Sequence, residues 1–571
     1  MIAGLAWMLV ANAACLLGAY ALASRLSTGQ RSADLALFLL LRFSLASAAV
    51  LATGLLGILT ARTLGLLGAA ALAGLLLGGA HRTIPWAALR GLRRDYPALL
   101  LATAGLVLAR FVAQAWFLAP HDGDATCYHL PKVAEWVQAG AITRETGVDY
   151  RSPFPGGFEL FEIWWTVFLH HDVLVEAAGI ELWILALAAV HALGRWTGLS
   201  RGMALAAGLL FCTTPIVLMQ AVSCLNDLPV VAILLTSAAL IAARVQPFVL
   251  LLPLGVGIGV KPTFGFALPG LALLAFLVRK DPPASRPGRA AAAGGALLGA
   301  FLGTYWYLRN LVLYGNPIYP GGARGFVLND EFLVQQVGPN LVSLRENLRR
   351  LVDSRLYDHL LGYNPTSEYI AGWGPAVFGC GFLALLVALR EPGRLRLLAA
   401  ALAVSLVSVL TLVLSDRWFV RFVLFVPALA CLALPPLAVR IRGLPLLLGI
   451  LVAIQFATTV FLSRNAVGEY PALARQPWRK RAADMIAGLP KDAEPVACLQ
   501  GGGLFNYLLY GPDFSRRVIY IRAGKPEEIV AEMRRLEVKR IYGSRDATSV
   551  LEEMVKARLL KPEIGRFYSL P

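Results

Sequence analysis

His121-Asp-Gly-Asp-Ala-Thr-Cys-Tyr-His-Leu-Pro-Lys132 is a polar stretch between two hydrophobic parts of the chain. It follows an apolar run and precedes an amphipathic segment that closes at Gly140. Charged groups are costly in or beside hydrocarbon, so acids at this depth indicate a functional site. We therefore expect Asp122 and Asp124 in a water-facing loop at the membrane edge.

The composition around this stretch is that of a membrane protein. Of 571 residues, 57% are hydrophobic and 15% charged, and the mean hydropathy is +0.65. Soluble domains are about 45–50% apolar and about 25% charged. The formal net charge of +17 comes from short basic clusters between apolar runs, and no basic stripe is interleaved with aromatic residues. That pattern follows the positive-inside rule, so we expect membrane lipids and no nucleic acid as partners.

Apolar windows of roughly 20 residues predict an α-helical polytopic fold with about 13 to 14 spans. The windows lie near 2–24, 33–57, 62–79, 96–118, 173–194, 202–219, 228–243, 247–260, 263–278, 289–313, 371–389, 396–414, 418–438 and 443–462.

Loops rich in lysine and arginine alternate along the chain with loops that hold few of them. The rich set contains Arg25, Arg31, Arg82, Arg90, Arg93, Arg94, Arg195, Arg201, Arg244, Arg279, Lys280, Arg286, Arg289, Arg390, Arg394, Arg396, Arg440 and Arg442. The positive-inside rule places this set in the cytoplasm. The opposite face then carries the Asp122/Asp124 loop, the Asn226-Asp227 loop, the Lys261 turn, the long 314–370 loop and everything after about 463.

Three domains are predicted from these patterns: an accessory transmembrane bundle at 1–95, a transmembrane core at 96–462 with outer loops 119–172 and 314–370, and a soluble domain at 463–571. The last domain is expected to be small, α/β and extracytoplasmic. Its predicted strands are Pro495–Leu499, Arg517–Ile521, Arg540–Gly543 and Gly565–Leu570, and its clearest helix is Pro526–Leu536. Gln500-Gly-Gly-Gly503 lacks the Lys-Ser/Thr of a phosphate-binding P-loop, which favours an ordinary turn.

The seven cysteines show no CxxC or CxxH spacing, so the sequence predicts no metal cluster. Cys127 and Cys224 flank the two acidic loops, and a disulfide between them is conceivable. Whether a divalent cation takes part is left open, because no acidic cluster has clear ligand spacing.

The segment Asp124-Ala-Thr-Cys-Tyr-His-Leu-Pro131 with Trp136-Val-Gln-Ala-Gly140 resembles the first outer loop of GT-C membrane glycosyltransferases. These multi-span enzymes take sugars from polyprenyl-phosphate donors, and they include protein mannosyltransferases and lipid A aminoarabinose transferases. Further motifs similar to the bacterial branch are Ser223-Cys-Leu-Asn-Asp227, Lys261-Pro-Thr263, Trp306-Tyr-Leu-Arg-Asn310, Gly315-Asn-Pro-Ile-Tyr-Pro320 and Arg421-Phe-Val-Leu-Phe-Val-Pro427. The resemblance covers about 96–462, and it implies a multi-pass enzyme of a bacterial inner (plasma) membrane with its active-site loops outside.

The resemblance implies an inverting transfer of sugar from a polyprenyl phosphate to a glycan, lipid or protein acceptor. A carboxylate would take the proton of the acceptor hydroxyl. The family presents one acid before the Tyr-His pair or an Asp-Glu doublet, whereas this chain has Asp-Gly-Asp; Asp124 keeps the family's spacing and is our candidate base. The alternative for Asp124 is a helix N-cap. Asp122 is either a positioning group or a turn residue, and Asp227 is either part of a shared site or the start of a helix.

Fixed cations would neutralise the departing phosphate. The candidates for binding it are Lys261, Arg309, Arg421, His129 and Tyr128. Lys261 either pairs with a lipid phosphate or extends to the interface. The two arginines lie beside Trp306 and Trp418 and either hold phosphate bidentately or anchor the interface. His129 and Tyr128 either bind the donor or fix the loop to the following helix.

Two other functions compete with transfer. A transporter or flippase of lipid-linked sugars would place its charges near mid-membrane, whereas here they lie at span ends. A non-catalytic envelope scaffold would not need Asp124. The 314–370 loop is too long for a simple connector, and we expect it to cover the site.

Overall fold

The computed structural model describes residues 2–83, 96–117, 120, 122–143, 151–281, 288–322, 325–326, 345, 372–374, 376–390, 393–412, 419–462, 494–499, 506–521, 524–543, 548–563 and 567–571. Nearly all of the predicted covering loop, Gln500-Gly-Gly-Gly503 and Trp418 lie outside these ranges. The domain boundaries predicted at 95/96 and 462/463 lie at the edges of described ranges and stay predictions.

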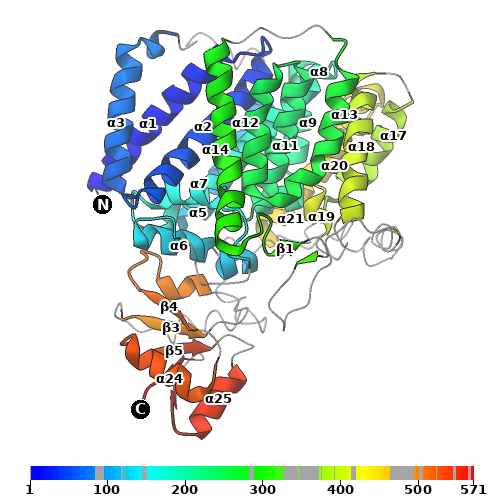
Figure 1. The fold of residues 1–571 in the computed structure, drawn as a ribbon. Helices are drawn as coiled ribbons and strands as arrows, with labels where there is room; N and C mark the ends of the chain where they lie inside the picture. The colour runs from blue at the N-terminus through cyan, green and yellow to red at the C-terminus, as the bar shows by residue number, and fades with distance from the viewer. Residues whose placement is uncertain are drawn as a thin grey trace.

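A block of roughly aligned helices forms most of the molecule, and a smaller domain projects from one end of it (Figure 1). The helices are α1 (Ile2–Arg25), α2 (Arg31–Leu55), α3 (Ala61–Leu77), α5 (Ala98–Phe117), α6 (Leu130–Ala139), α7 (Glu159–Thr166), α8 (Ala177–Trp196), α9 (Arg201–Cys212), α10 (Pro215–Gln220), α11 (Asp227–Ala242), α12 (Pro247–Val260), α13 (Leu268–Leu277), α14 (Arg289–Tyr314), α17 (Phe382–Ala388), α18 (Arg394–Leu412), α19 (Phe419–Phe422), α20 (Phe425–Arg440) and α21 (Leu444–Leu462).

The helical, membrane-spanning architecture is confirmed, and every predicted apolar window contains helix. Within the described residues, five helices are long and apolar enough to cross a membrane: Ile2–Arg25, Arg31–Leu55, Ala98–Phe117, Asp172–Trp196 and Arg394–Thr411. Eight shorter apolar helices accompany them. The window 202–219 is interrupted after Cys212, because Pro215 lacks the N–H needed to continue a helix and instead begins α10.

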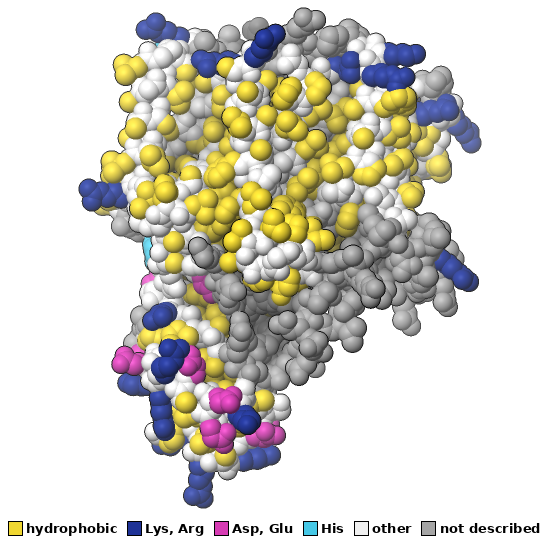
Figure 2. Space-filling view, in the orientation of Figure 1, with side chains coloured by type: hydrophobic (Ala, Val, Ile, Leu, Met, Phe, Trp, Pro, Cys, Tyr) yellow, Lys and Arg dark blue, Asp and Glu magenta, His cyan; other side chains and the backbone are white. Residues whose placement is uncertain are grey.

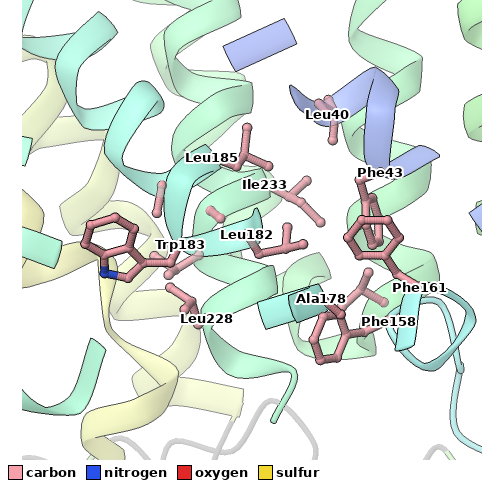
Figure 3. Close-up of a cluster of buried hydrophobic side chains, with 14 of the residues drawn as sticks. Leu40, Phe43, Phe158, Phe161, Ala178, Leu182, Trp183, Leu185, Leu228 and Ile233 are labelled. Carbon is pink, nitrogen blue, oxygen red and sulfur yellow. The ribbon is translucent and has the colours of Figure 1, made fainter. Parts of the chain in front are cut away.

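The core of the block joins the N-terminal helices to the centre of the molecule. Phe43 of α2 meets Phe161 of α7 edge to face, with ring centroids 5.0 Å apart, and both are buried (Figure 3). Trp183 of α8 is fully buried, and its indole N–H donates to the Cys212 carbonyl at 2.8 Å. Each buried aromatic side chain removes about 150–250 Å² from solvent, so such contacts hold α7 firmly against the spans.

The loops predicted to be cytoplasmic do share one end of the block. Arg244 donates to the Arg279 carbonyl at 2.8 Å, and Arg394 donates to the Trp196 carbonyl at 3.0 Å. The first bond joins the loop after α11 to the loop after α13, and the second joins the end of α8 to the start of α18. Figure 2 shows lysine and arginine along the end of the block farthest from the small domain. Hydrophobic side chains cover the face of the block between that end and the small domain.

The small domain contains a five-stranded sheet with strand order β4-β3-β5-β7-β6, which confirms the predicted α/β class. Its elements are β3 (Val496–Leu499), η6 (Asn506–Tyr510), β4 (Val518–Ile521), α24 (Pro526–Arg535), β5 (Arg540–Gly543), α25 (Thr548–Lys556), β6 (Lys561–Pro562) and β7 (Phe567–Ser569). Strand β3 is central and pairs in parallel with β4 and β5, while β7 runs antiparallel to β5. The predicted strands and helix differ from these bounds by at most two residues at each end.

This domain is docked on the outer loop that carries the polar stretch. The Tyr510 hydroxyl donates to Glu135 of α6 at 3.1 Å, and the Tyr507 hydroxyl donates to Asp172 at 3.0 Å. Gln138 of α6 donates to the carbonyls of Phe514 and Arg516 at 2.7 and 2.8 Å. The small domain and the polar loop therefore lie at the same end of the molecule (Figure 1).

Candidate active site

Asp122 caps the turn that carries Asp124. Its Oδ1 accepts hydrogen bonds from the backbone N–H of Asp124 at 3.0 Å and of Ala125 at 3.2 Å, and the side chain is buried. The Asp124 side chain makes no capping bond. The capping alternative weighed for Asp124 is therefore wrong for that residue, and Asp122 plays the role that favours Asp at helix starts.

The turn that follows is a π-helix, Ala125–His129, which runs directly into α6. Single π turns inside helices occur frequently at functional sites, because they shift a side chain out of the regular helical register. The five residues of this turn are buried. The base candidate Asp124 thus lies at the start of a rigid, enclosed segment.

Asp124 lies between two guanidinium groups. Arg151 Nη1 is 3.2 Å from Oδ1, and Arg421 Nη1 is 3.1 Å from Oδ2. Burial raises the pKa of the Asp124 carboxyl, but Arg421 and Arg151 together outweigh burial and hold that pKa below its ordinary value. Asp124 is therefore charged in this state.

Arg421 links Asp124 to the second acidic loop. Its Nε lies 3.6 Å from Oδ2 of Asp227, and Lys261 Nζ lies 2.5 Å from Oδ1 of the same carboxylate. Within the described residues, three cationic side chains (Arg151, Lys261 and Arg421) contact these two carboxylates. The sequence brought Asp124, Asp227, Lys261 and Arg421 to one face, and the structure brings them into one network.

Tyr128 and His129 stand behind this network. The Arg151 guanidinium carbon lies 4.0 Å from the centroid of the Tyr128 ring. His129 Nδ1 lies 2.9 Å from Glu159 Oε1, and an ionised Glu159 only accepts, so this nitrogen donates the proton. The His129 contact ties the π turn to α7, not to the helix that follows it in the sequence. Both alternatives for Tyr128 and His129 stay predictions.

Arg309 is the predicted cation that does not reach the carboxylates. Its Nη2 donates to the Pro153 carbonyl at 2.6 Å, and its guanidinium carbon lies 5.0 Å from the Trp306 ring centroid. Within the described part of the chain it forms no ion pair with Asp124 or Asp227. It braces the segment that presents Arg151.

Sequence reasoning missed four charged residues of this region: Arg151, Lys132, Glu159 and Glu162. Lys132 Nζ lies 3.6 Å from Glu159 Oε1, and both side chains are fully buried. Burial raises the pKa of Glu162 well above its ordinary value. The signal was present, because Gly157-Phe-Glu-Leu-Phe-Glu-Ile-Trp164 places two acids in an apolar run, and such acids indicate a buried polar cluster. Arg151 gave no comparable signal, since it lies in a mixed loop.

A narrow apolar crevice leads away from the network into the helical block. It is lined by Asp227 and Arg421 at its mouth and by α11, the 3₁₀ turn Pro262–Ala267, α18 and α20 further in. Its wall residues include Val230, Leu234, Phe266, Val409 and Phe425. The free volume is about 20 Å³, room for roughly one water molecule. A thin apolar group would enter it only if these side chains moved apart.

The carboxylates do not form a metal site in the structure. Among the described residues, no group of three or more His, Cys, Asp and Glu side chains could hold a metal ion. Asp124 and Asp227 are instead engaged by arginine and lysine. Cys127 and Cys224 are both free thiols, so the conceivable disulfide between them is not formed.

Comparison with known proteins adds a structural likeness. No family model and no curated protein matches the sequence. The structure of ArnT from Cupriavidus metallidurans in the apo state has a TM-score of 0.51 at 13% identity, over 83% of this chain and 97% of that chain. The structure of the same protein bound to undecaprenyl phosphate has a TM-score of 0.51 at 14% identity, with the same coverage. The chain thus has the fold of ArnT, which agrees with the fold that the resemblance of its motifs implied.

Proposed function

We propose that this protein is an inverting glycosyltransferase that moves a sugar from a polyprenyl-phosphate donor to an acceptor outside the cytoplasm. One observation carries the proposal: Arg421 bridges Asp124 and Asp227 at the mouth of an apolar crevice. A candidate base, three cationic side chains and an apolar crevice meet at one place. Those are the features that a sugar joined to a lipid phosphate requires.

The donor would be held by its phosphate and by its tail. Lys261 and Arg421 take the phosphate, since arginine offers a planar fork and lysine a point charge to phosphate oxygens. The first isoprene units enter the crevice behind Asp227. The likeness to ArnT bound to undecaprenyl phosphate supports a lipid phosphate of this kind.

Asp124 acts as the base in this proposal. The acceptor oxygen attacks the anomeric carbon while its proton passes to the Asp124 carboxylate. The bond from that carbon to the phosphate oxygen breaks, and the polyprenyl phosphate leaves with its charge neutralised by Lys261 and Arg421. Attack is direct, so the configuration at the sugar inverts. General base catalysis typically contributes about 10²–10⁴ in rate.

Arg421 would couple donor binding to base strength. While Arg421 and Arg151 both hold Asp124, its lowered pKa makes it a weak base. A phosphate that takes Arg421 removes one of these two charges from Asp124 and strengthens it as a base. The base would therefore become effective only after the donor is seated.

The test uses purified protein in lipid nanodiscs with a panel of radiolabelled polyprenyl-phosphate sugars and an acceptor extract. We expect release of free polyprenyl phosphate with one donor, and loss of that release in Asp124→Asn. Asp122→Asn is the matched control, because it alters the neighbouring acid but keeps an oxygen to cap the turn. If Asp124→Asn retains full release, the assignment of the base is wrong. If the wild-type protein binds polyprenyl phosphate but consumes no donor, the transferase hypothesis is replaced by that of a transporter or a scaffold.

A further inference from the structure

A second cavity lies far from this site, among α1, α2 and α3. Its volume is about 560 Å³, within the range of about 300–1,000 Å³ typical of small-molecule sites. The floor comes from α1, and the walls come from α2 and α3. Its lining is apolar or small, with no aspartate or glutamate, and Arg25 is its one charged residue.

The cavity forms because α3 meets α1 closely at one end and separates from it toward the other. A Cβ atom at Gly68 would lie 2.7 Å from Ala11 Cα, so the two backbones are in contact there. A Cβ atom at Gly74 would meet nothing within 4 Å. Between them α3 advances about 1.7 turns toward its C-terminal end, which is the end predicted to be cytoplasmic. The space therefore widens toward the basic end of the block.

Two arginines lie beside the cavity at that end. Arg25 ends α1 and lines the cavity, and Arg82 lies in the 3₁₀ turn Ala80–Thr83, which packs on α1 and α3. Neither has an ion pair within the part of the chain that the structure describes. The nearby acid Asp34 is engaged by the Ser27 hydroxyl at 2.9 Å and by the Thr28 N–H at 2.6 Å.

We propose that this cavity binds an acyl chain of an anionic glycerophospholipid of the cytoplasmic leaflet, with the lipid phosphate held by Arg25 and Arg82. The apolar lining suits the chain, and the unpaired guanidiniums suit an anionic head group. The site is separate from the donor crevice, because Arg25 and the Asp124 network lie at opposite ends of the helical block. It does not depend on the proposed transferase activity.

Native mass spectrometry of the full chain, released from nanodiscs that contain phosphatidylglycerol and phosphatidylethanolamine, tests the site. Gly74→Leu places a side chain in the cavity, and it should abolish retention of the most tightly held phosphatidylglycerol. Gly294→Leu of α14 is the matched control, since a Cβ there also meets nothing within 4 Å. Leucine favours helix over glycine by roughly 1 kcal/mol, so both variants should fold. Equal retention in the two variants overturns the proposal.

Two further measurements identify the occupant. Arg25→Gln and Arg82→Gln should each weaken phosphatidylglycerol retention by about fivefold, because a basic residue near the surface contributes about 1 kcal/mol to anionic-lipid binding. Phosphatidylethanolamine retention should not change in these variants. Retention without preference for the anionic lipid, or displacement of phospholipid by added polyprenyl phosphate in wild type but not in Gly74→Leu, overturns the assignment to an anionic phospholipid.

Discussion

Two carboxylates in or beside the polar stretch are largely buried, but their pKa values shift in opposite directions. Asp124 is held by the guanidiniums of Arg151 and Arg421, whereas Glu135 accepts a hydrogen bond from the Tyr510 hydroxyl of the small domain. Burial raises the pKa of both. At Asp124 the guanidiniums outweigh burial and leave the pKa lowered, but at Glu135 burial prevails over Tyr510 and Lys132, and the pKa stays well above its ordinary value.

The partner therefore decides what each acid can do. Asp124 is kept charged by cations that a phosphate can take over, which suits a group that changes its role during a reaction. Glu135 is favoured in the neutral form by burial and is hydrogen-bonded by Tyr510 of the small domain, which suits a group that holds two parts together. In this comparison the Asp124 network is the exchange region, where ion-pair partners would change, and the Glu135–Tyr510 contact is the attachment region, which holds the small domain.

The largest effect is expected from Arg421→Gln, which removes the group that joins Asp124 to Asp227. We expect transfer to fall by about 10²–10³, the usual loss when one fixed charge-stabilising donor is removed from an active site. The measurement is release of polyprenyl phosphate under saturating and limiting donor. Arg421→Lys keeps the charge but cannot bridge both acids, and it should give an intermediate rate. Wild-type rates in Arg421→Gln would show that the network is structural only.

The attachment region should respond to Tyr510→Phe. The loss leaves the buried Glu135 without its donor, at a cost of about 1–3 kcal/mol to docking. Proteolytic release of the small domain should become faster, while donor binding should change little. Tyr520→Phe is the control, because among the described residues its hydroxyl bonds only to Tyr510. Equal effects of the two variants would mean that Glu135 does not anchor the domain.

A change of pH should separate the two regions further. Because the docked pKa of Glu135 is raised, docking is fully stabilised below the ordinary glutamate pKa and weakens as pH rises through the raised value. Asp124 has the reverse sign, so its ion pairs persist above its ordinary pKa and are lost as pH falls through the lowered value. Protease release of the small domain should therefore rise with pH, and Glu135→Gln should flatten that rise. A flat profile in wild type would contradict the assignment.

The sequence could predict which face holds the site, but not which side chains pair there. Apolar windows and basic loops place Asp124, Asp227, Lys261 and Arg421 at one end, because those patterns report depth and side. Pairing depends on contacts between residues as distant in the chain as Asp124 and Arg421, and no local pattern encodes such contacts. For this reason the ion pair of Lys261 with Asp227 was not predicted, while phosphate binding by Lys261 stays a prediction.

Local patterns worked best in the small domain and worst in the mixed loop after Gly140. The strand predicted at Arg540–Gly543 is β5 residue for residue, since an Ile-Tyr pair closed by glycine is typical of a short strand. No such local sequence pattern surrounds Arg151, so only the structure shows that it lies beside Asp124. The roles of Asp122 and Asp124 could also be distinguished only in the structure, because the two residues have the same chemistry and differ in their partners.

The smallest effect expected concerns that last distinction. Asp122→Ala removes the cap of the π turn but leaves Asp124 between its two guanidiniums. Losing a helix cap typically costs about 0.5–2 kcal/mol, so the melting temperature should fall and transfer should drop less than about tenfold. Asp122→Asn, which can still cap, should restore most of the stability. If Asp122→Ala abolished transfer while the protein stayed folded, the base would be Asp122. The comparison with Glu135 would then concern Asp122 and not Asp124.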